Sequence, residues 1–290
     1  MNQLGLATKM RKQWQFFCLA IGFFTRIPVP SLPNFQESDL NHATPYFPLV
    51  GLIIGILAAL SYYVATLLFT QPIAVLLSMA VTIALTGAFH EDGLADSADG
   101  LGGGWEREQV LTIMQDSRLG TYGAIALLLM LMAKFQILSA LDPDFVVLGL
   151  VAAHALSRLC AVWLIVSLPY AKAESNITSK AKPLSTKISK VGFVWANMVG
   201  LLPTLFIIWI FFVATHGFWQ ISLIFVGLLV LLIGGVWWWW RNLLARKLGG
   251  YTGDNLGAMQ QITELAFYFA ALIYLQLLDK DFFGLLDKLT

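Results

Sequence analysis

The chain has 290 residues, of which 58% are hydrophobic and only 12% are charged, and its formal net charge is +1. Soluble domains contain about 45–50% apolar and about 25% charged residues, so this composition indicates a polytopic membrane protein. No basic groove interleaved with aromatic residues is visible, which argues against nucleic-acid binding. The two cysteines, Cys18 and Cys160, lack CxxC spacing and are expected in the core. We expect residues 1–290 to form a single integral membrane domain.

Near the N-terminus, basic residues precede an apolar run from Trp14 to Phe24. A transmembrane helix needs about 20 residues. Since this run has only about eleven, we expect an interfacial or re-entrant helix. Residues 25–33 follow with three prolines, which enforce extended structure. Arg26, at the lip of the apolar run, is either a snorkelling anchor or a phosphate ligand.

Seven longer apolar runs follow, each roughly 17–25 residues long, which is the length of a transmembrane helix. They lie at about 47–69, 72–89, 121–141, 145–168, 193–215, 218–240 and 262–278. The bilayer core holds no water, so each run is expected to be helical or to be shielded by its neighbours. The sequence therefore predicts an all-α polytopic membrane protein with about seven transmembrane helices and an N-terminal interfacial or re-entrant helix.

The links between the runs predict the orientation of the chain. Three links are very short and carry no Lys or Arg, and the other links are long and polar. If the links alternate sides, the N-terminus and all long links share one face. Fourteen basic residues then lie on that face and two on the other, a positive-inside signal that predicts cytoplasmic long links. The fourteen are Lys9, Arg11, Lys12, Arg26, Arg107, Arg118, Lys172, Lys180, Lys182, Lys187, Lys190, Arg241, Arg246 and Lys247, and the two are Lys280 and Lys288.

The most informative stretch, His90 to Gly100, lies directly after the second long run and is rich in aspartate. If the helix of that run continues through it, a rotation of about 100° per residue puts Asp92, Asp96 and Asp99 within roughly 60° of one another. Three carboxylates on one face repel each other, and a hard divalent cation removes that repulsion. Mg²⁺ also coordinates substrate phosphates, so the stretch predicts a Mg²⁺–diphosphate site at a membrane surface. A solvated acidic helix end is the alternative.

Two further segments on the same predicted face suit a phosphate-containing substrate. Asp116 could complete the metal site, and Arg118 supplies a planar cation for phosphate oxygens; a local Asp–Arg surface pair is the alternative. Residues 249–258 are rich in glycine, and their backbone N–H groups could hold an anion. Within them, Asp254 and Asn255 could bind metal or a ribose. An ordinary turn is the alternative for this segment.

Ionisable residues inside or near the apolar runs are costly in a membrane and are functional candidates. Arg158 lies mid-helix and should face the bundle interior. Glu264 starts the last run, within reach of the glycine-rich segment. Lys134 lies toward the far side, where we expect it to snorkel outward. His90 lies one turn or less from the carboxylates and could take a proton.

At this point the residues resemble a known family, cobalamin synthase, the adenosylcobinamide-GDP ribazoletransferases. Five segments carry the resemblance, and they lie in the family's order between about residues 16 and 265. The acidic stretch is the most specific of them. The segments are Phe24-Thr25-Arg26-Ile27-Pro28-Val29-Pro30, Tyr46-Phe47-Pro48-Leu49-Val50-Gly51, 89–100, Asp116-Ser117-Arg118-Leu119-Gly120 and Gly249-Gly250-Tyr251-Thr252-Gly253-Asp254.

The resemblance implies a Mg²⁺-dependent phosphotransferase. Its members join adenosylcobinamide-GDP to α-ribazole, or to α-ribazole 5′-phosphate, and release GMP together with adenosylcobalamin or its 5′-phosphate. The whole chain would then be one catalytic domain in the bacterial cytoplasmic (inner) membrane, with its active site facing the cytoplasm. The expected partners are the two small-molecule substrates and the lipid bilayer, with no nucleic acid. Homo-oligomerisation or association with other enzymes of the cobalamin pathway stays open.

The resemblance also implies roles for individual residues. Asp92, Asp96 and Asp99 would bind Mg²⁺, with Asp116 as a further carboxylate. His90 is a candidate base, with a carboxylate as its competitor. Phosphate and substrate groups would be held by residues drawn from several links. The catalytic set is His90, Asp92, Asp96, Asp99 and Arg118, and the substrate-binding set is Arg26, Asp116, Arg158, Gly250, Gly253, Asp254, Asn255 and Glu264.

Two other functions are weighed against this one. Phosphotransferases that use CDP-alcohols share an Asp-Gly-x-x-Ala stretch, but they usually have Arg after that alanine, where this chain has Asp96. An ion-coupled transporter would normally place its acidic residues near the bilayer midplane, whereas here they cluster at the membrane edge. Both alternatives fit the sequence less well than the ribazoletransferase.

Overall fold

The computed structural model describes residues 3–30, 36, 38–171, 187–214 and 219–279. Within these ranges the secondary structure is helical, apart from one isolated parallel bridge between Tyr170 and Tyr251. A 3-10 turn precedes α3, and a short π-helix joins α10 to α11. The helices are α1 (Gln3–Phe24), α2 (Asp39–Ala43), α3 (Phe47–Thr66), α4 (Gln71–Thr86), α5 (Phe89–Gly103), α6 (Arg107–Met114), α7 (Thr121–Ala140), α8 (Pro143–Ser167), α9 (Lys190–Ala214), α10 (Trp219–Leu229), α11 (Gly235–Lys247) and α12 (Gly253–Asp279).

Six of the described helical segments are long and apolar enough to cross a membrane, and the bent pair α4–α5 makes a seventh if it counts as one span. This confirms the predicted all-α polytopic fold. The six segments are Asp39–Thr66, Thr121–Ala140, Pro143–Ser167, Lys190–Val213, Ser222–Lys247 and Gly253–Leu278.

Helix α8 forms the centre of the bundle, with 83% of its most apolar window buried. Helix α3 packs directly on it through two glycines. A Cβ added at Gly55 would lie 2.8 Å from Val151 Cα, and one added at Gly51 would collide with the His154 carbonyl. Small residues let the backbones of membrane helices approach closely, which explains this packing. Both cysteines are buried and free, as predicted.

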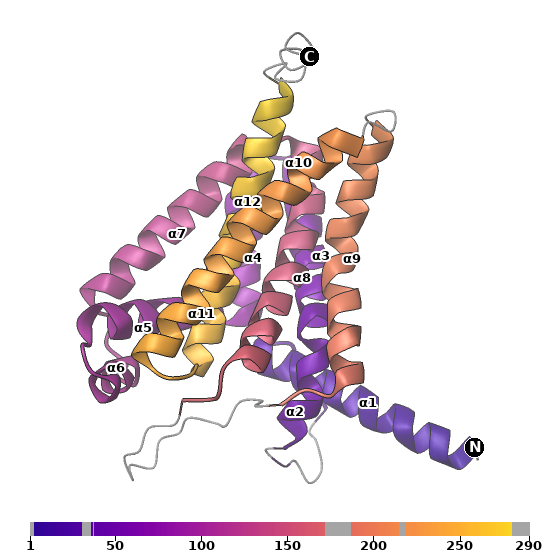
Figure 1. Ribbon diagram of the computed structural model, residues 1–290. Coiled ribbons are helices and arrows are strands. Elements are labelled where there is room, and N and C mark those ends of the chain that lie inside the picture. Colours follow the sequence, from indigo (N-terminus) through magenta and orange to yellow (C-terminus); the bar gives the residue numbers. More distant parts are fainter. Residues whose placement is uncertain (1–2, 31–35, 37, 172–186, 215–218, 280–290) are drawn as a thin grey trace.

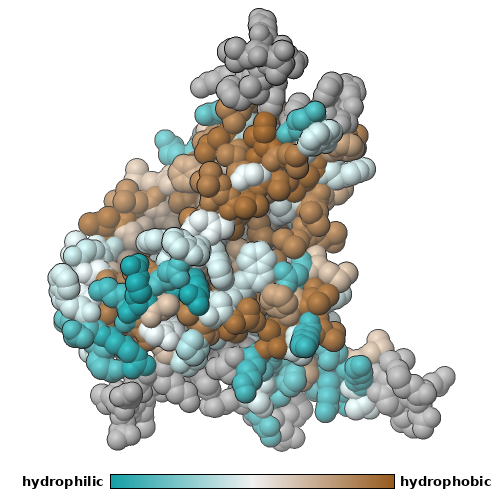
Figure 2. All heavy atoms as spheres, viewed as in Figure 1, coloured by the Kyte–Doolittle hydropathy of each residue, from teal (hydrophilic) through white to brown (hydrophobic). Residues whose placement is uncertain are grey.

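The outer helices carry the surface expected of lipid contact. Large apolar side chains on α3, α4, α7, α9 and α10 are exposed, among them Leu60, Leu76, Leu129, Phe206 and Leu223. Figure 2 shows hydrophobic residues over the upper part of one face, while hydrophilic residues gather at the lower end over α5 and α6. Since a soluble protein rarely exposes an apolar surface this extended, these faces point to the bilayer.

The links alternate between the two ends of the bundle. Helices α1, α2, α5 and α6 lie at one end, whereas the α3–α4 and α7–α8 links lie at the other (Figure 1). Helix α1 crosses that first end at a slant, as expected of an interfacial helix. Residues 172–186, with three of the fourteen basic residues predicted on one face, lie outside the described residues.

The second span ends in a sharp corner. Helix α4 stops at Thr86, and Gly87 and Ala88 both take left-handed conformations, with φ of 65° and 60°. The axis of α5 therefore turns 85° away from that of α4. The expectation that one continuous helix carries the acidic stretch is wrong. We treat α4 as the spanning part of this pair, because α5 runs along the end of the bundle.

Two further boundaries differ from the apolar runs. Helix α11 continues to Lys247 rather than ending at 240, and α12 begins at Gly253 rather than at 262. Polar residues such as Gln260 and Gln261 precede the last apolar run, so the sequence places its start after them. In the structure they are buried against neighbouring helices, so the helix continues through them.

Candidate active site

Three aspartates from two neighbouring helices lie near one another at the end of the bundle. Asp92 and Asp96 lie one turn apart on α5, and Asp254 lies in the first turn of α12. The helices can approach because α5 has Gly93 at the crossing, where an added Cβ would lie only 2.7 Å from the Asp254 carbonyl oxygen. None of the three carboxylates forms an ion pair with a basic residue in the described part of the chain.

The electrostatics of this group follow from that arrangement. Partial burial, and then the charges of Asp92 and Asp254, raise the pKa of Asp96 to about 7. A carboxylate crowded by others and lacking a cation is easily protonated. A divalent cation would relieve the crowding, and oxygen donors of this kind suit Mg²⁺. Asp92, Asp96 and Asp254 are therefore the donor set most suited to the expected cofactor.

The carboxylates do not converge as in a preformed metal centre. Among the residues that the structure describes, no three His, Cys, Asp or Glu side chains stand close enough to hold a metal ion as they are. Cation binding would require their side chains to turn toward one another. Such a change is compatible with Mg²⁺, which keeps several waters and takes part of its coordination from substrate phosphates.

Asp99, expected as a third ligand on α5, is used differently. Its Oδ2 accepts a hydrogen bond from Gly120 N at 2.8 Å, and its Oδ1 accepts one from Gly123 N at 2.9 Å. These N–H groups belong to the start of α7, where a helix favours negative charge. Asp99 is buried, so in this structure it ties α5 to α7.

The loop after α6 holds the Asp116–Arg118 pair. Arg118 Nη2 lies 2.6 Å from Asp116 Oδ2, and Arg118 Nε donates to both carboxylate oxygens at 3.0 Å. The adjacent guanidinium lowers the pKa of Asp116 to about 2. The Arg118 side chain is 87% exposed. In the structure, Asp116 and Arg118 therefore form a local surface pair. This was the alternative to Asp116 as a metal ligand and Arg118 as a phosphate ligand.

The glycine-rich segment is a capped helix start. Tyr251 N donates to Pro169 O at 3.0 Å, and Thr252 N donates to Asn255 Oδ1 at 2.9 Å. Asn255 N in turn donates to Thr252 Oγ1 at 3.4 Å, the reciprocal pattern of a capping box. These N–H groups are therefore already used, which leaves them unavailable to cradle an anion. Gly250 is required because a Cβ there would collide with the Pro169 carbonyl.

His90 and Arg26 lie on either side of the α4–α5 corner. The His90 ring is only 2% exposed and stacks on Phe24, with ring centroids 5.8 Å apart. Burial lowers the pKa of His90 well below its usual value. Arg26 donates its backbone N–H to Leu85 O at 2.7 Å, and its exposed side chain lies over Gly87. Arg26 can reach solvent from this position, whereas His90 cannot.

Arg158 and Glu264 lie inside the bundle, 2% and 1% exposed. Glu264 pairs with Lys134, whose Nζ is 2.9 Å from Glu264 Oε1. The expectation that Lys134 snorkels outward is wrong, because the buried carboxylate of Glu264 draws it inward. Arg158 faces the bundle interior, as expected, and neither it nor Glu264 is open to a substrate in this structure.

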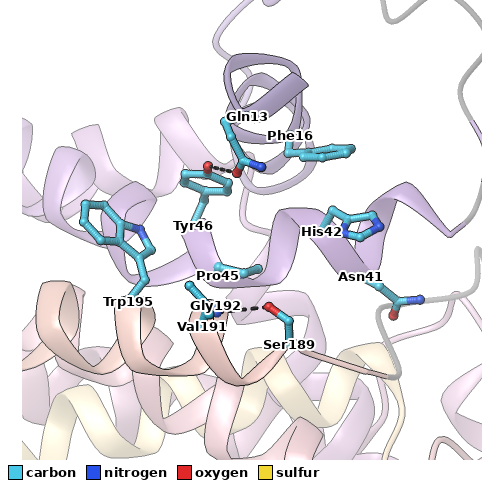
Figure 3. A pocket seen from close by; sticks show the side chains of 10 residues that line it. All are labelled: Gln13, Phe16, Asn41, His42, Pro45, Tyr46, Ser189, Val191, Gly192 and Trp195. Atoms are coloured by element: carbon cyan, nitrogen blue, oxygen red, sulfur yellow. Dashed lines mark hydrogen bonds between the residues drawn. The ribbon is translucent and has the colours of Figure 1, made fainter. Parts of the chain in front are cut away.

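A separate cavity of about 380 Å³ lies between α1, the α2–α3 junction and the start of α9 (Figure 3). Aromatic and amide side chains line it, including Phe16, Tyr46, Trp195 and Gln13, and none of its lining residues is Lys, Arg, Asp or Glu. Tyr46 Oη donates to Gln13 Oε1 at 2.6 Å. The lining also includes His42, so the cavity offers aromatic, amide and imidazole groups to a ligand.

Known proteins resemble the chain over nearly its whole length. A family model described as cobalamin-5-phosphate synthase matches residues 16–272. The adenosylcobinamide-GDP ribazoletransferase of Ralstonia pickettii (strain 12J) is 41% identical over 271 residues, which cover 92% of this chain and 98% of that protein. The chain belongs to this family. The proteins of the same name from Shewanella amazonensis and Vibrio parahaemolyticus are 43% and 42% identical, covering 91% and 92% of this chain and 96% and 95% of theirs. No solved structure matches.

Membership of the cobalamin-5-phosphate synthase family confirms the resemblance carried by the five sequence segments. Three residues that join α5 to α12 by hydrogen bonds were given no role by the sequence analysis. They are Glu91 and Ser97 on α5 and Gln261 on α12. For Gln261, the sequence signal that could have indicated a role is its place beside an apolar run, because an amide in a membrane helix usually has a polar partner.

Proposed function

We propose that this protein is an adenosylcobinamide-GDP ribazoletransferase that uses Mg²⁺ to join adenosylcobinamide-GDP to α-ribazole, or to its 5′-phosphate, with release of GMP. Family membership over residues 16–272 supports the activity. The observation that carries the chemistry is the trio Asp92, Asp96 and Asp254, three carboxylates without a basic partner among the described residues. A bound Mg²⁺ would offset the charge that develops on the phosphate oxygens.

The reaction is a displacement at phosphorus. A hydroxyl oxygen of α-ribazole bonds to the phosphorus attached to cobinamide, the bond from that phosphorus to the GMP oxygen breaks, and GMP leaves with the electron pair. Asp92, Asp96 and Asp254 would hold the diphosphate end through the cation. We assign the hydroxyl proton to one of these carboxylates rather than to His90, whose ring is buried beneath Phe24. Arg26, exposed at the adjacent corner, is the arginine best placed to contact phosphate oxygens.

The cavity in Figure 3 would receive an aromatic part of a large substrate. Tyr46 lines the cavity, and Phe47 is the next residue in the sequence. The ring of Phe47 contacts that of Phe24, and the ring of Phe24 stacks on that of His90. A series of aromatic contacts therefore runs from beside the cavity to α5. With fourteen basic residues predicted on this face against two on the other, the site would face the cytoplasm of a bacterium from its inner membrane.

The test is GMP release by the purified full-length chain given adenosylcobinamide-GDP, α-ribazole and Mg²⁺, beside the Asp96→Asn variant. We expect GMP and a cobalamin product from wild type. In the variant we expect a loss on the order of several hundredfold, the scale seen when one charge-stabilising group is removed. Wild-type protein that is folded but forms no ribazole-dependent product would reject the function. Equal turnover by both proteins would keep the function and reject the carboxylate assignment. Turnover with CDP-diacylglycerol instead would favour a CDP-alcohol phosphotransferase.

A further inference from the structure

Polar side chains that are buried or, at Glu91, partly buried cross the bundle from α8 to α5, and we call them the buried charge cluster: Glu91, Lys134, His154, Arg158, Gln261 and Glu264. Its centre is Lys134 on α7. The Nζ atom of Lys134 lies 2.9 Å from Glu264 Oε1 and donates to Gln261 Oε1, also at 2.9 Å. Lys134, Gln261 and Glu264 are all buried, so these contacts are shielded from solvent.

Helix α8 closes the cluster on one side. His154 Nδ1 lies 3.3 Å from Glu264 Oε2, and Arg158 Nη1 donates to the His154 carbonyl at 3.0 Å. The four charged members balance, since Lys134 and Arg158 oppose Glu91 and Glu264. Balance matters here because an unpaired charge in a membrane interior is costly.

Gln261 connects this cluster to the acidic helix. While its Oε1 accepts from Lys134, its Nε2 donates to Glu91 Oε1 on α5 at 2.9 Å. Glu91 immediately precedes Asp92. The second oxygen of Glu91, Oε2, is buried and has no hydrogen-bond partner among the described residues. Among these residues, Gln261 supplies the side-chain hydrogen bond that holds Glu91, and the buried charge of Arg158 attracts the same carboxylate.

A second polar contact joins the same two helices farther along α5. Asn255 Nδ2 on α12 donates to Ser97 Oγ at 2.9 Å, and both residues are fully buried. In the sequence of α5, Asp92 and Asp96 lie between Glu91 and Ser97. The two contacts thus fix the rotation and height of the segment that carries both carboxylates relative to α12.

We propose that Gln261 is a positioning residue. By bonding Lys134 and Glu91 at once, it uses the rigid charge cluster of the bundle to hold Asp92 and Asp96 against Asp254. The inference rests on the proposed function for its kinetic readout, though not for its structural one. The Gln261 side chain is only 3% exposed and would act on the site through Glu91.

The test compares two variants of the full-length chain in lipid nanodiscs. Gln261→Met keeps the size and the neutral charge of the side chain but removes both hydrogen bonds. Gln71→Met is the matched control, because Gln71 also makes two amide hydrogen bonds, to the Leu138 and Leu141 carbonyls at 3.1 and 2.8 Å, at the other end of α7. Two quantities are measured: amide hydrogen exchange over residues 89–103, and the Mg²⁺ concentration that gives half-maximal GMP release.

In Gln261→Met we expect α5 to exchange about tenfold faster, and the half-maximal Mg²⁺ concentration to rise about tenfold with kcat changed less than threefold at saturation. Gln71→Met should leave both values unchanged. If Gln261→Met does not fold, Glu91→Met provides the second test, because it removes the Gln261–Glu91 hydrogen bond from its partly buried side and should shift both readouts in the same direction. Wild-type values in a folded Gln261→Met or Glu91→Met protein would overturn the proposal. An inactive wild type would reject the proposed function, and the exchange readout would then decide the positioning role alone.

Discussion

At the scale of single residues, the ionisation of Asp96 links the site to pH. Burial and the neighbouring aspartates raise its pKa to about 7, so it holds a proton below that pH and is free to bind a cation above it. Because Mg²⁺ must displace the proton, we expect the half-maximal Mg²⁺ concentration to rise about tenfold between pH 8 and pH 6. Initial rates of GMP release over Mg²⁺ titrations at both pH values measure this shift. The same half-maximal concentration at both would contradict it.

The arrangement of Asp92 and Asp96 is the part of the candidate site that the sequence could predict. The spacing of Asp92 and Asp96 places them on one helical face, and the structure keeps them there. The partners of Asp99 could not be predicted, because Gly120 and Gly123 lie more than twenty residues farther along and bind it through backbone N–H groups. Nor could the sequence choose between a surface pair and a metal site for Asp116, since both use the same side chains.

At the scale of helices, the contact between α5 and α12 depends on a residue without a side chain. A Cβ at Gly93 would lie 2.7 Å from one backbone atom of Asp254 and 3.0 Å from another, so Gly93→Ala must push the helices apart. We expect GMP release to fall at least about tenfold, since a displacement near 1 Å can cost a hundredfold in rate.

Gly227→Ala on α10 is the matched control, because an added Cβ there has nothing within 4 Å. It should keep full activity and leave stability unchanged or raise it by about 0.5–1 kcal/mol through helix propensity. Rates and thermal unfolding midpoints of both variants provide the comparison. Equal rates in the two variants would show that close packing at Gly93 is not needed for turnover.

The apolar runs predicted every span, but they could not predict where the helices bend or begin. The left-handed Ala88 at the α4–α5 corner has no local signal, since only tertiary packing holds a residue with a Cβ in that conformation. The start of α12 could not be predicted because several of its first residues are polar. Hydropathy assigns such residues to a link between helices, whereas here they are buried within the bundle.

At the scale of the whole molecule, the bundle is stabilised by charges that one substitution would unbalance. Lys134→Met removes the ammonium group that lies 2.9 Å from Glu264 Oε1, so the buried carboxylate of Glu264 loses its ion pair with Lys134. We expect a loss of about 3–5 kcal/mol, as for other buried pairs broken on one side. Adding Glu264→Gln restores the balance between Arg158 and Glu91 and should recover part of this loss. Thermal unfolding in detergent measures both variants. A double variant less stable than Lys134→Met would contradict the charge-balance explanation.

The corner at Gly87 and Ala88 has a further consequence. The helical path is broken at these two left-handed residues, so their backbone conformation sets the direction in which α5 leaves α4. One residue inserted between Thr86 and Phe89 would re-aim α5 and its aspartates while leaving all five family segments intact. The proposed site would therefore depend on the length of this corner as well as on the identity of its residues.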